Sequence, residues 1–228
     1  AKDVKSILDD NGIWHIELSY MPLMLNMNSY DTICHEHLEY YSLTSLKYLM
    51  DMVGLKIIKI SFNDINGGSI AIDVAKKDSV YREVSMKIKS ILRLEKRKKY
   101  NEIKTQKKFF LNCKRNKTLL VNLLKKLKKD KKIVYGYGAS TKGNVILQYC
   151  RIKDNLIKKI VEINKFKYNK YTPGTKIKII SESEVKLINP DYYLVLPWHF
   201  KKNIVEREKK YLKKGGKLIF PLPKIQIV

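Results

Sequence analysis

One stretch decides the fold of the second half of the chain: Gly136-Tyr137-Gly138-Ala139-Ser140-Thr141-Lys142-Gly143-Asn144. Residues 132–137 predict a strand and residues 145–150 a helix, so these glycines join a strand to a helix. Such a loop lets the backbone approach a ligand, and a helix N-terminus favours an anion such as phosphate. The glycine spacing matches neither the dinucleotide fingerprint nor a P-loop. The loop therefore indicates an anionic ligand or, alternatively, only a tight turn.

The residues after this loop continue the same alternation of strands and helices. Expected strands are 156–163, 176–180, 192–196 and 217–221, and an expected helix is 204–213. Strands that alternate with helices predict a mainly parallel, doubly wound sheet.

Three polar side chains of the loop have a functional and a structural interpretation. Lys142 can add a positive charge beside a diphosphate, and Ser140 and Thr141 can donate to it or only cap the helix.

Glu162 ends an expected strand, where an acidic group often meets a ribose hydroxyl, although a solvated strand end fits equally well.

Two aromatic side chains follow the expected strand 192–196. Trp198 and His199 would face the ligand crevice of an open α/β sheet, where Trp198 can stack on a ring. The alternative is a loop anchored by a buried tryptophan.

A histidine cluster lies nearer the N-terminus, in the run Cys34-His35-Glu36-His37 with Tyr40 behind it. Histidine accepts a proton near neutral pH, a neighbouring carboxylate can orient it, and a tyrosine can hydrogen-bond a substrate oxygen. This equipment suits proton removal beside a carbonyl. The alternatives are a surface loop and a partial metal site. His15, within an expected strand, is interpreted as structural.

The first part of the chain predicts the closing half of an α/β domain with a terminal hairpin. Its expected elements are a helix over 2–10, strands over 13–20, 55–62 and 69–75, a helix over 44–53 and a turn over 63–68. The chain opens as if inside a helix, so we expect a fragment of a longer protein.

Residues 79–132 lack glycine and proline and predict one long helix or two. The side chains expected to face a core are Phe109, Phe110, Leu119, Leu120, Leu123, Leu124 and Leu127. The expected parts are therefore residues 1–78, a basic helical connector 79–131, and a second α/β domain 132–228.

The composition limits the classes of partner. The 228 residues have a net charge of +25, which suits nucleic acid, an anionic membrane or a phosphorylated substrate. Lysine far outnumbers arginine, which is the better group for bidentate recognition of phosphate or guanine. We therefore favour the interpretation that the lysines are scattered over solvated helix faces and form no binding surface. No apolar run is long enough to span a membrane. Cys34, Cys113 and Cys150 form no Cys-x-x-Cys pair, which argues against a disulfide scaffold or zinc site and favours the cytoplasm.

In order along the chain, several motifs resemble the deoxysugar C-methyltransferases of the tetronitrose C-3′-methyltransferase type. These motifs are Asp31-Thr32-Ile33, His35-Glu36-His37-Leu38 with Tyr40, Gly54-Leu55, Gly67-Gly68-Ser69, Gly136-Tyr137-Gly138-Ala139-Ser140 with Lys142-Gly143-Asn144, Tyr171-Thr172-Pro173-Gly174-Thr175 and Pro197-Trp198-His199-Phe200. The resemblance implies an N-terminal zinc domain, absent here, and a class I methyltransferase domain for S-adenosylmethionine, of which residues 1–78 are the C-terminal half. It also implies a Rossmann-like C-terminal domain for the nucleotide sugar.

The resemblance also implies roles for residues. The substrate would be a nucleotide-linked 4-keto-deoxysugar, methylated at C3 after His37 removes a proton, with Glu36, Cys34 and Tyr40 in the active site. The family usually has tyrosine at the position of Cys34. Residues expected to bind the nucleotide diphosphate sugar are Gly138, Ala139, Ser140, Thr141, Lys142, Asn144, Glu162, Trp198 and His199. We expect a cytoplasmic monomer, inactive as this fragment, that binds neither nucleic acid nor membrane.

Two functions from other classes remain as alternatives. The glycine loop and parallel sheet also suit an NAD(P)-dependent oxidoreductase, although the loop spacing and the lack of a hydride-transfer constellation count against it. The charge alone suggests a basic nucleic-acid-binding module.

Overall fold

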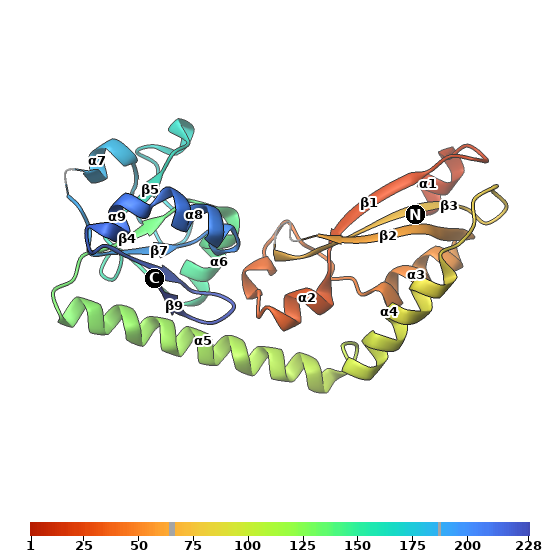
Figure 1. The fold of residues 1–228 in the computed structure, drawn as a ribbon, viewed down its shortest axis with the longest axis horizontal. Helices are drawn as coiled ribbons and strands as arrows, with labels where there is room; N and C mark the ends of the chain where they lie inside the picture. The colour runs from red at the N-terminus through yellow and green to blue at the C-terminus, as the bar shows by residue number, and fades with distance from the viewer. Residues whose placement is uncertain (64–66, 187) are drawn as a thin grey trace. The chain divides into compact units, whose positions relative to one another are not determined.

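The computed structural model describes residues 1–63, 67–186 and 188–228, which divide into two compact units. Unit 1 contains residues 1–27 and 38–109, and unit 2 contains residues 28–37 and 110–228 (Figure 1). The short segment 28–37 therefore folds with the C-terminal part of the chain. In the described ranges, no helix has both the length and the apolar content needed to cross a membrane.

Unit 1 is built on an antiparallel sheet of order β1-β3-β2. Its strands are β1 (Trp14–Ser19), β2 (Leu55–Asn63) and β3 (Ser69–Lys76). The central strand β3 is buried along most of its length, because it has a neighbour on each side. The expected turn over 63–68 falls partly on residues 64–66, outside the described residues.

Helices complete the core of unit 1: α1 (Lys2–Ile7), α2 (Met21–Asn26), α3 (Leu43–Met52) and α4 (Ser85–Lys98). Leu46 and Met50 of α3 pack with Ile57 and Ile72 of the sheet. The buried Glu95 of α4 accepts hydrogen bonds of 2.8 and 2.9 Å from the backbone N–H groups of Leu43 and Thr44. These N–H groups begin α3 and have no intrahelical acceptor, so Glu95 joins the two helices.

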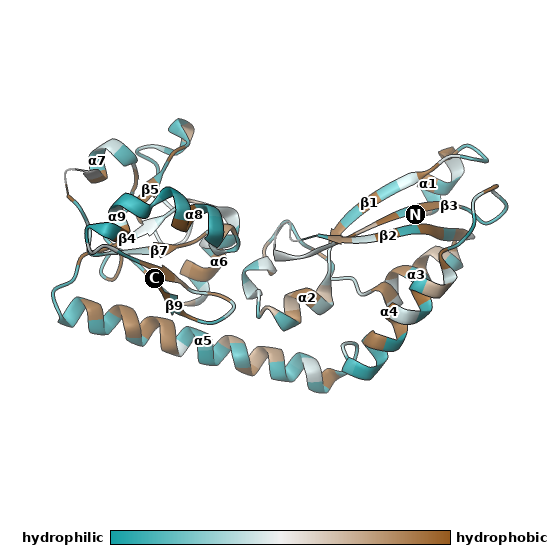
Figure 2. Cartoon of the chain, viewed as in Figure 1, coloured by the Kyte–Doolittle hydropathy of each residue, from teal (hydrophilic) through white to brown (hydrophobic). Residues whose placement is uncertain are grey.

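The basic segment expected over 79–131 contains α4 and the long helix α5 (Ile103–Lys129). The expectation that Phe110 and Leu119 face a core is wrong, because they are 53% and 52% exposed. In the part of α5 that belongs to unit 2, the buried side chains are Cys113, Asn116, Leu120, Leu124 and Leu127, which recur every three or four residues. Phe110 and Leu119 lie off this stripe, and Figure 2 shows apolar and polar bands alternating along α5.

Unit 2 contains a sheet of order β6-β5-β4-β7-β8-β9, parallel except for β9. Its strands are β4 (Val134–Tyr137), β5 (Ile160–Glu162), β6 (Ile179–Ser181), β7 (Tyr192–Val195), β8 (Lys217–Phe220) and β9 (Gln226–Ile227). The prediction of a mainly parallel sheet is confirmed. The first strand, β4, lies between β5 and β7, so the chain leaves β4 toward one side and later returns to the other.

The helices and short turns of unit 2 differ in detail from expectation. They are η1 (Tyr30–Thr32), α6 (Thr141–Tyr149), η3 (Lys165–Lys167), α7 (Glu182–Lys186), η4 (Trp198–Phe200), α8 (Lys201–Arg207) and α9 (Lys209–Lys213). Helix α6 begins at Thr141 instead of residue 145, because the Ser140 side chain caps it by accepting from the Gly143 N–H at 3.0 Å. The helix expected over 204–213 is interrupted at Glu208.

Candidate functional site

The loop between β4 and α6 lies at the carboxyl end of the central strand of unit 2. Gly138 has φ +79°, and a Cβ there would lie 2.8 Å from the Pro197 side chain. Glycine is therefore required by both conformation and space. Gly143 is confined by space alone, since a Cβ there would lie 2.7 Å from the Leu196 side chain.

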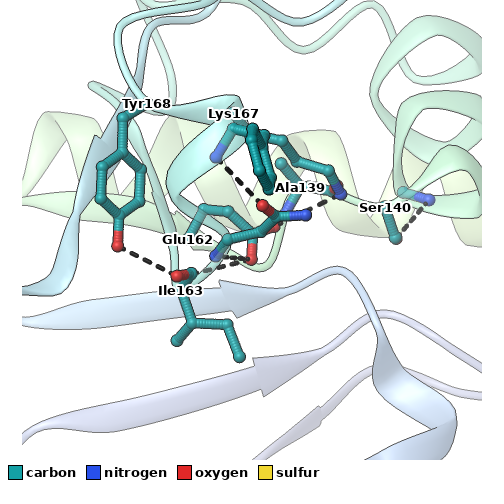
Figure 3. A network of polar contacts seen from close by, with 9 residues as sticks. Ala139, Ser140, Glu162, Ile163, Lys167 and Tyr168 are labelled. Atoms are coloured by element: carbon teal, nitrogen blue, oxygen red, sulfur yellow. Dashed lines mark hydrogen bonds and ion pairs between the residues drawn. The ribbon is translucent and has the colours of Figure 1, made fainter.

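The Glu162 carboxylate holds this loop from the end of β5 (Figure 3). It accepts hydrogen bonds of 2.8 Å from the Ala139 and Ile163 N–H groups and one of 3.0 Å from Asn164. The Lys167 ammonium lies 3.7 Å away and also donates to the Ala139 carbonyl at 2.6 Å. Glu162 is 8% exposed, so the interpretation as a solvated strand end is wrong.

A cavity of about 360 Å³ opens beside the loop. Gly138, Ala139, Ser140 and Glu162 line it, together with Phe200 from the region after β7. This volume is within the range of small-molecule sites, and the carboxyl end of parallel strands is where open α/β sheets bind ligands.

The charged side chains around the cavity are compensated. Arg207 pairs with Glu182 and lies 3.6 Å from Glu208, and Lys167 lies beside Glu162. The cavity wall therefore presents opposite charges in pairs instead of a concentration of positive charge.

A second polar cluster of unit 2 joins α6 and η4 to the segment that carries the histidines. The Trp198 Nε1–H donates to Asp31 Oδ2 at 2.7 Å, and Lys142 Nζ donates to Thr32 Oγ1 at 3.4 Å. Asp31 is fully buried and Trp198 is 4% exposed. The interpretation of Trp198 as a buried anchor therefore describes its position, and the cluster gives it a specific polar partner.

Burial shifts the ionisation of this cluster. It raises the pKa of Asp31, while the Trp198 N–H and the Lys142 charge act in the opposite direction. Burial also lowers the pKa of Lys142, partly offset by Asp31 and Cys34, and lowers the pKa of His199 to about 4. Within this cluster, Asp31 Oδ1 and His199 Nδ1 are buried without a hydrogen-bond partner.

The histidine cluster follows Asp31 and Thr32 in the chain and forms a turn. The Cys34 N–H donates to the Thr32 carbonyl at 3.0 Å, and the His37 N–H donates to the Cys34 carbonyl at 3.1 Å. His35 is largely exposed, with its Nε2 4.0 Å from a Glu36 oxygen. His37 and Cys34 are half-buried. In the ranges that the structure describes, no group of three His, Cys, Asp or Glu residues could hold a metal ion.

The site residues predicted from sequence lie in separate parts of the structure. Gly138, Ala139, Ser140 and Glu162 line the cavity, whereas Lys142, Trp198 and His199 belong to the cluster around Asp31. Thr141 and Asn144 lie in the first turn of α6, and Tyr40 belongs to unit 1.

Sequence reasoning missed some residues of these places. It assigned no role to Asp31, Thr32 or Phe200, although all three lie in quoted motifs, and it did not single out Lys167 or Arg207. A carboxylate just before an aromatic and histidine-rich run was a usable signal for Asp31. Lys167 and Arg207 carried no signal within the lysine-rich background.

Comparison with known proteins shows the family of the chain. A family model described as the C-methyltransferase C-terminal domain matches residues 64–223. The C-methyltransferase NovU of Streptomyces niveus is 32% identical over 225 residues, which cover 99% of this chain and 53% of that protein. This chain thus spans about half the length of that relative. The chain belongs to the C-methyltransferase family that its sequence motifs resemble.

Proposed function

We propose that this chain is the C-terminal part of an enzyme that methylates a carbon atom of a nucleotide-linked 4-keto-deoxysugar. The family match carries this proposal, together with a histidine-bearing turn held on the same unit as a ligand-sized cavity. The methyl donor of the proposal is S-adenosylmethionine, which supplies an electrophilic methyl group on sulfur.

The described residues of this chain give no observation that supports a site for that donor. The described part of unit 1 contains an antiparallel sheet and no strand that leads through a glycine loop into a parallel crossover. We therefore assign no residue of this chain to the methyl donor, and the roles below concern only the sugar.

The step assigned to this chain is proton removal. In the proposal, His37 accepts the proton from C3, and the electron pair of the C3–H bond forms an enolate with the C4 carbonyl. C3 then becomes the nucleophile that receives the methyl group. His37 is the proposed base because it is half-buried within the turn, whereas His35 is 84% exposed. Glu36 and Cys34, which lie in the same turn, are proposed as its neighbours in the active site.

The nucleotide part of the substrate is proposed to bind at the β4–α6 loop. The position of the loop at the carboxyl end of the central strand, its confined glycines and the adjoining cavity support this proposal. Since three N–H groups and Lys167 already surround the Glu162 carboxylate, we propose that Glu162 acts on the nucleotide through the loop it holds.

The experiment compares His37→Gln with the matched variant His35→Gln in the full-length protein. Loss of a positioned base typically costs about 10² to 10⁴ in rate. His37→Gln should lower both solvent deuterium exchange at C3 and methyl transfer by this factor, while His35→Gln remains near wild type. Equal rates for the two variants would exclude His37 as the base.

A further inference from the structure

Three successive side chains near the start of unit 2 are buried against α5, α6 and η4. The Tyr30 hydroxyl donates to Asn116 Oδ1 of α5 at 3.0 Å, and the Tyr30 ring lies 5.1 Å from that of Tyr149 on α6. Asp31 accepts from Trp198, and Thr32 accepts from Lys142. Tyr30, Asp31 and Thr32 are all no more than 3% exposed.

The chain leaves the interior directly after this triplet. Ile33 is 49% exposed, and the turn from Cys34 to His37 follows. Residue 38 already belongs to unit 1. Within unit 2, Asp31 and Thr32 are therefore the last deeply buried side chains before the proposed base, six and five residues away.

The partners of the triplet are neighbours in sequence of the cavity lining. Pro197, which lines the cavity, directly precedes Trp198, and Ser140 precedes Lys142 by two residues. The same short segments therefore carry both the wall of the cavity and the contacts to Asp31 and Thr32. This connects the position of the turn to that of the cavity within one unit.

The chemistry of the anchor is directional. A buried carboxylate is costly unless its partners compensate it, and apolar packing would attach the segment at lower cost. A hydrogen bond from an indole N–H fixes both the position and the orientation of its acceptor. An anchor of this kind therefore selects one placement of the following residues, whereas apolar packing would tolerate several.

We propose that Asp31 and Trp198 are positioning residues that fix the histidine-bearing turn on unit 2 relative to the cavity. This inference rests on the proposed role of His37 as base. In this inference, Asp31 and Trp198 act through the backbone that leads to His37 and not through contact with the substrate.

The test compares Trp198→Phe with Trp14→Phe, a matched change in β1 of unit 1. Phenylalanine keeps an aromatic ring but has no N–H donor. In hydrogen exchange on the 228-residue chain, Trp198→Phe should increase exchange of the Cys34 and His37 amides, and Trp14→Phe should not. In the full-length enzyme, kcat should fall by up to about 100-fold, the cost of a small misplacement, with KM for the nucleotide sugar unchanged.

A second pair of variants distinguishes loss of the Asp31–Trp198 hydrogen bond from general unfolding. Asp31→Asn retains an oxygen acceptor for the Trp198 N–H and should keep the exchange of the turn near wild type, whereas Asp31→Ala should raise it. Unchanged exchange in a folded Trp198→Phe would overturn the inference, and so would increased exchange with an unchanged kcat. Failure of the His37 proposal would instead appear as full activity in His37→Gln, while the exchange results would stand.

Discussion

The backbone N–H of Ala139 donates a 2.8 Å hydrogen bond to the Glu162 carboxylate, 23 residues further along the chain. This bond joins the loop after β4 to the end of β5, the neighbouring parallel strand. Because the other carboxylate oxygen accepts from Ile163 and Asn164, one side chain holds both strand ends.

Replacement of Glu162 by glutamine should therefore destabilise unit 2. The amide group has one acceptor oxygen in place of two, and an unsatisfied buried group costs about 1–3 kcal/mol. Glu206→Gln is the control, since the Glu206 side chain is 68% exposed and, among the described residues, forms an ion pair only with Lys209. Urea unfolding should show a lower midpoint for Glu162→Gln alone. Equal midpoints would show that the carboxylate does not hold the loop.

Lys142 tests whether the β4–α6 loop binds a diphosphate. Removing the charge in Lys142→Met should weaken binding of a probe such as uridine diphosphate by about 10- to 100-fold, the usual value of a hydrogen bond to a charged group. The loss should shrink as salt is raised. Lys125→Met, an exposed change on α5, is the control. Unchanged affinity in titration calorimetry would restrict Lys142 to its contact with the Asp31 segment.

Adjacent leucines of α5 should respond differently to truncation. Leu120 is fully buried, and Leu120→Ala should reduce the free energy of unfolding by about 2–5 kcal/mol through lost burial and a cavity. Leu119 is 52% exposed, and Leu119→Ala should change the free energy of unfolding by about 0.5 kcal/mol or less. Denaturant unfolding of both variants measures the difference. Comparable losses would contradict the observed orientation of α5.

His199 should make the protein less stable as the pH falls. Its folded pKa of about 4 lies below the ordinary value of 6.5, so between these values the unfolded chain binds a proton that the folded chain does not. The free energy of unfolding should therefore decrease as the pH falls from about 6.5 to 4.

The measurement is the difference between wild type and His199→Asn in urea unfolding at several pH values. The raised pKa of Asp31 acts in the opposite sense, and this comparison isolates His199 from it. The exposed variant His35→Gln is the control. A difference that does not change with pH would contradict the lowered pKa of His199.

The sequence by itself determined most of the local structure. The alternation of strands and helices predicted the parallel sheet, because side-chain periodicity and turn residues act over a few positions. Gly138 marked its loop correctly, since only glycine tolerates both its φ and the approach of Pro197. The ends of elements were less predictable. Helix α6 began earlier than expected because a single side-chain cap at Ser140 sets its start.

The tertiary structure alone decided how the polar residues group. Trp198 and Asp31 are separated by 167 residues, and no periodicity in the sequence indicates that they meet. The sequence pattern likewise treated Phe110 and Leu119 as equivalent to Leu120, although only packing selects which stripe of a helix is buried. The histidine-bearing turn folds with unit 2 for the same reason, because buried contacts of Tyr30, Asp31 and Thr32 form only when distant segments pack together.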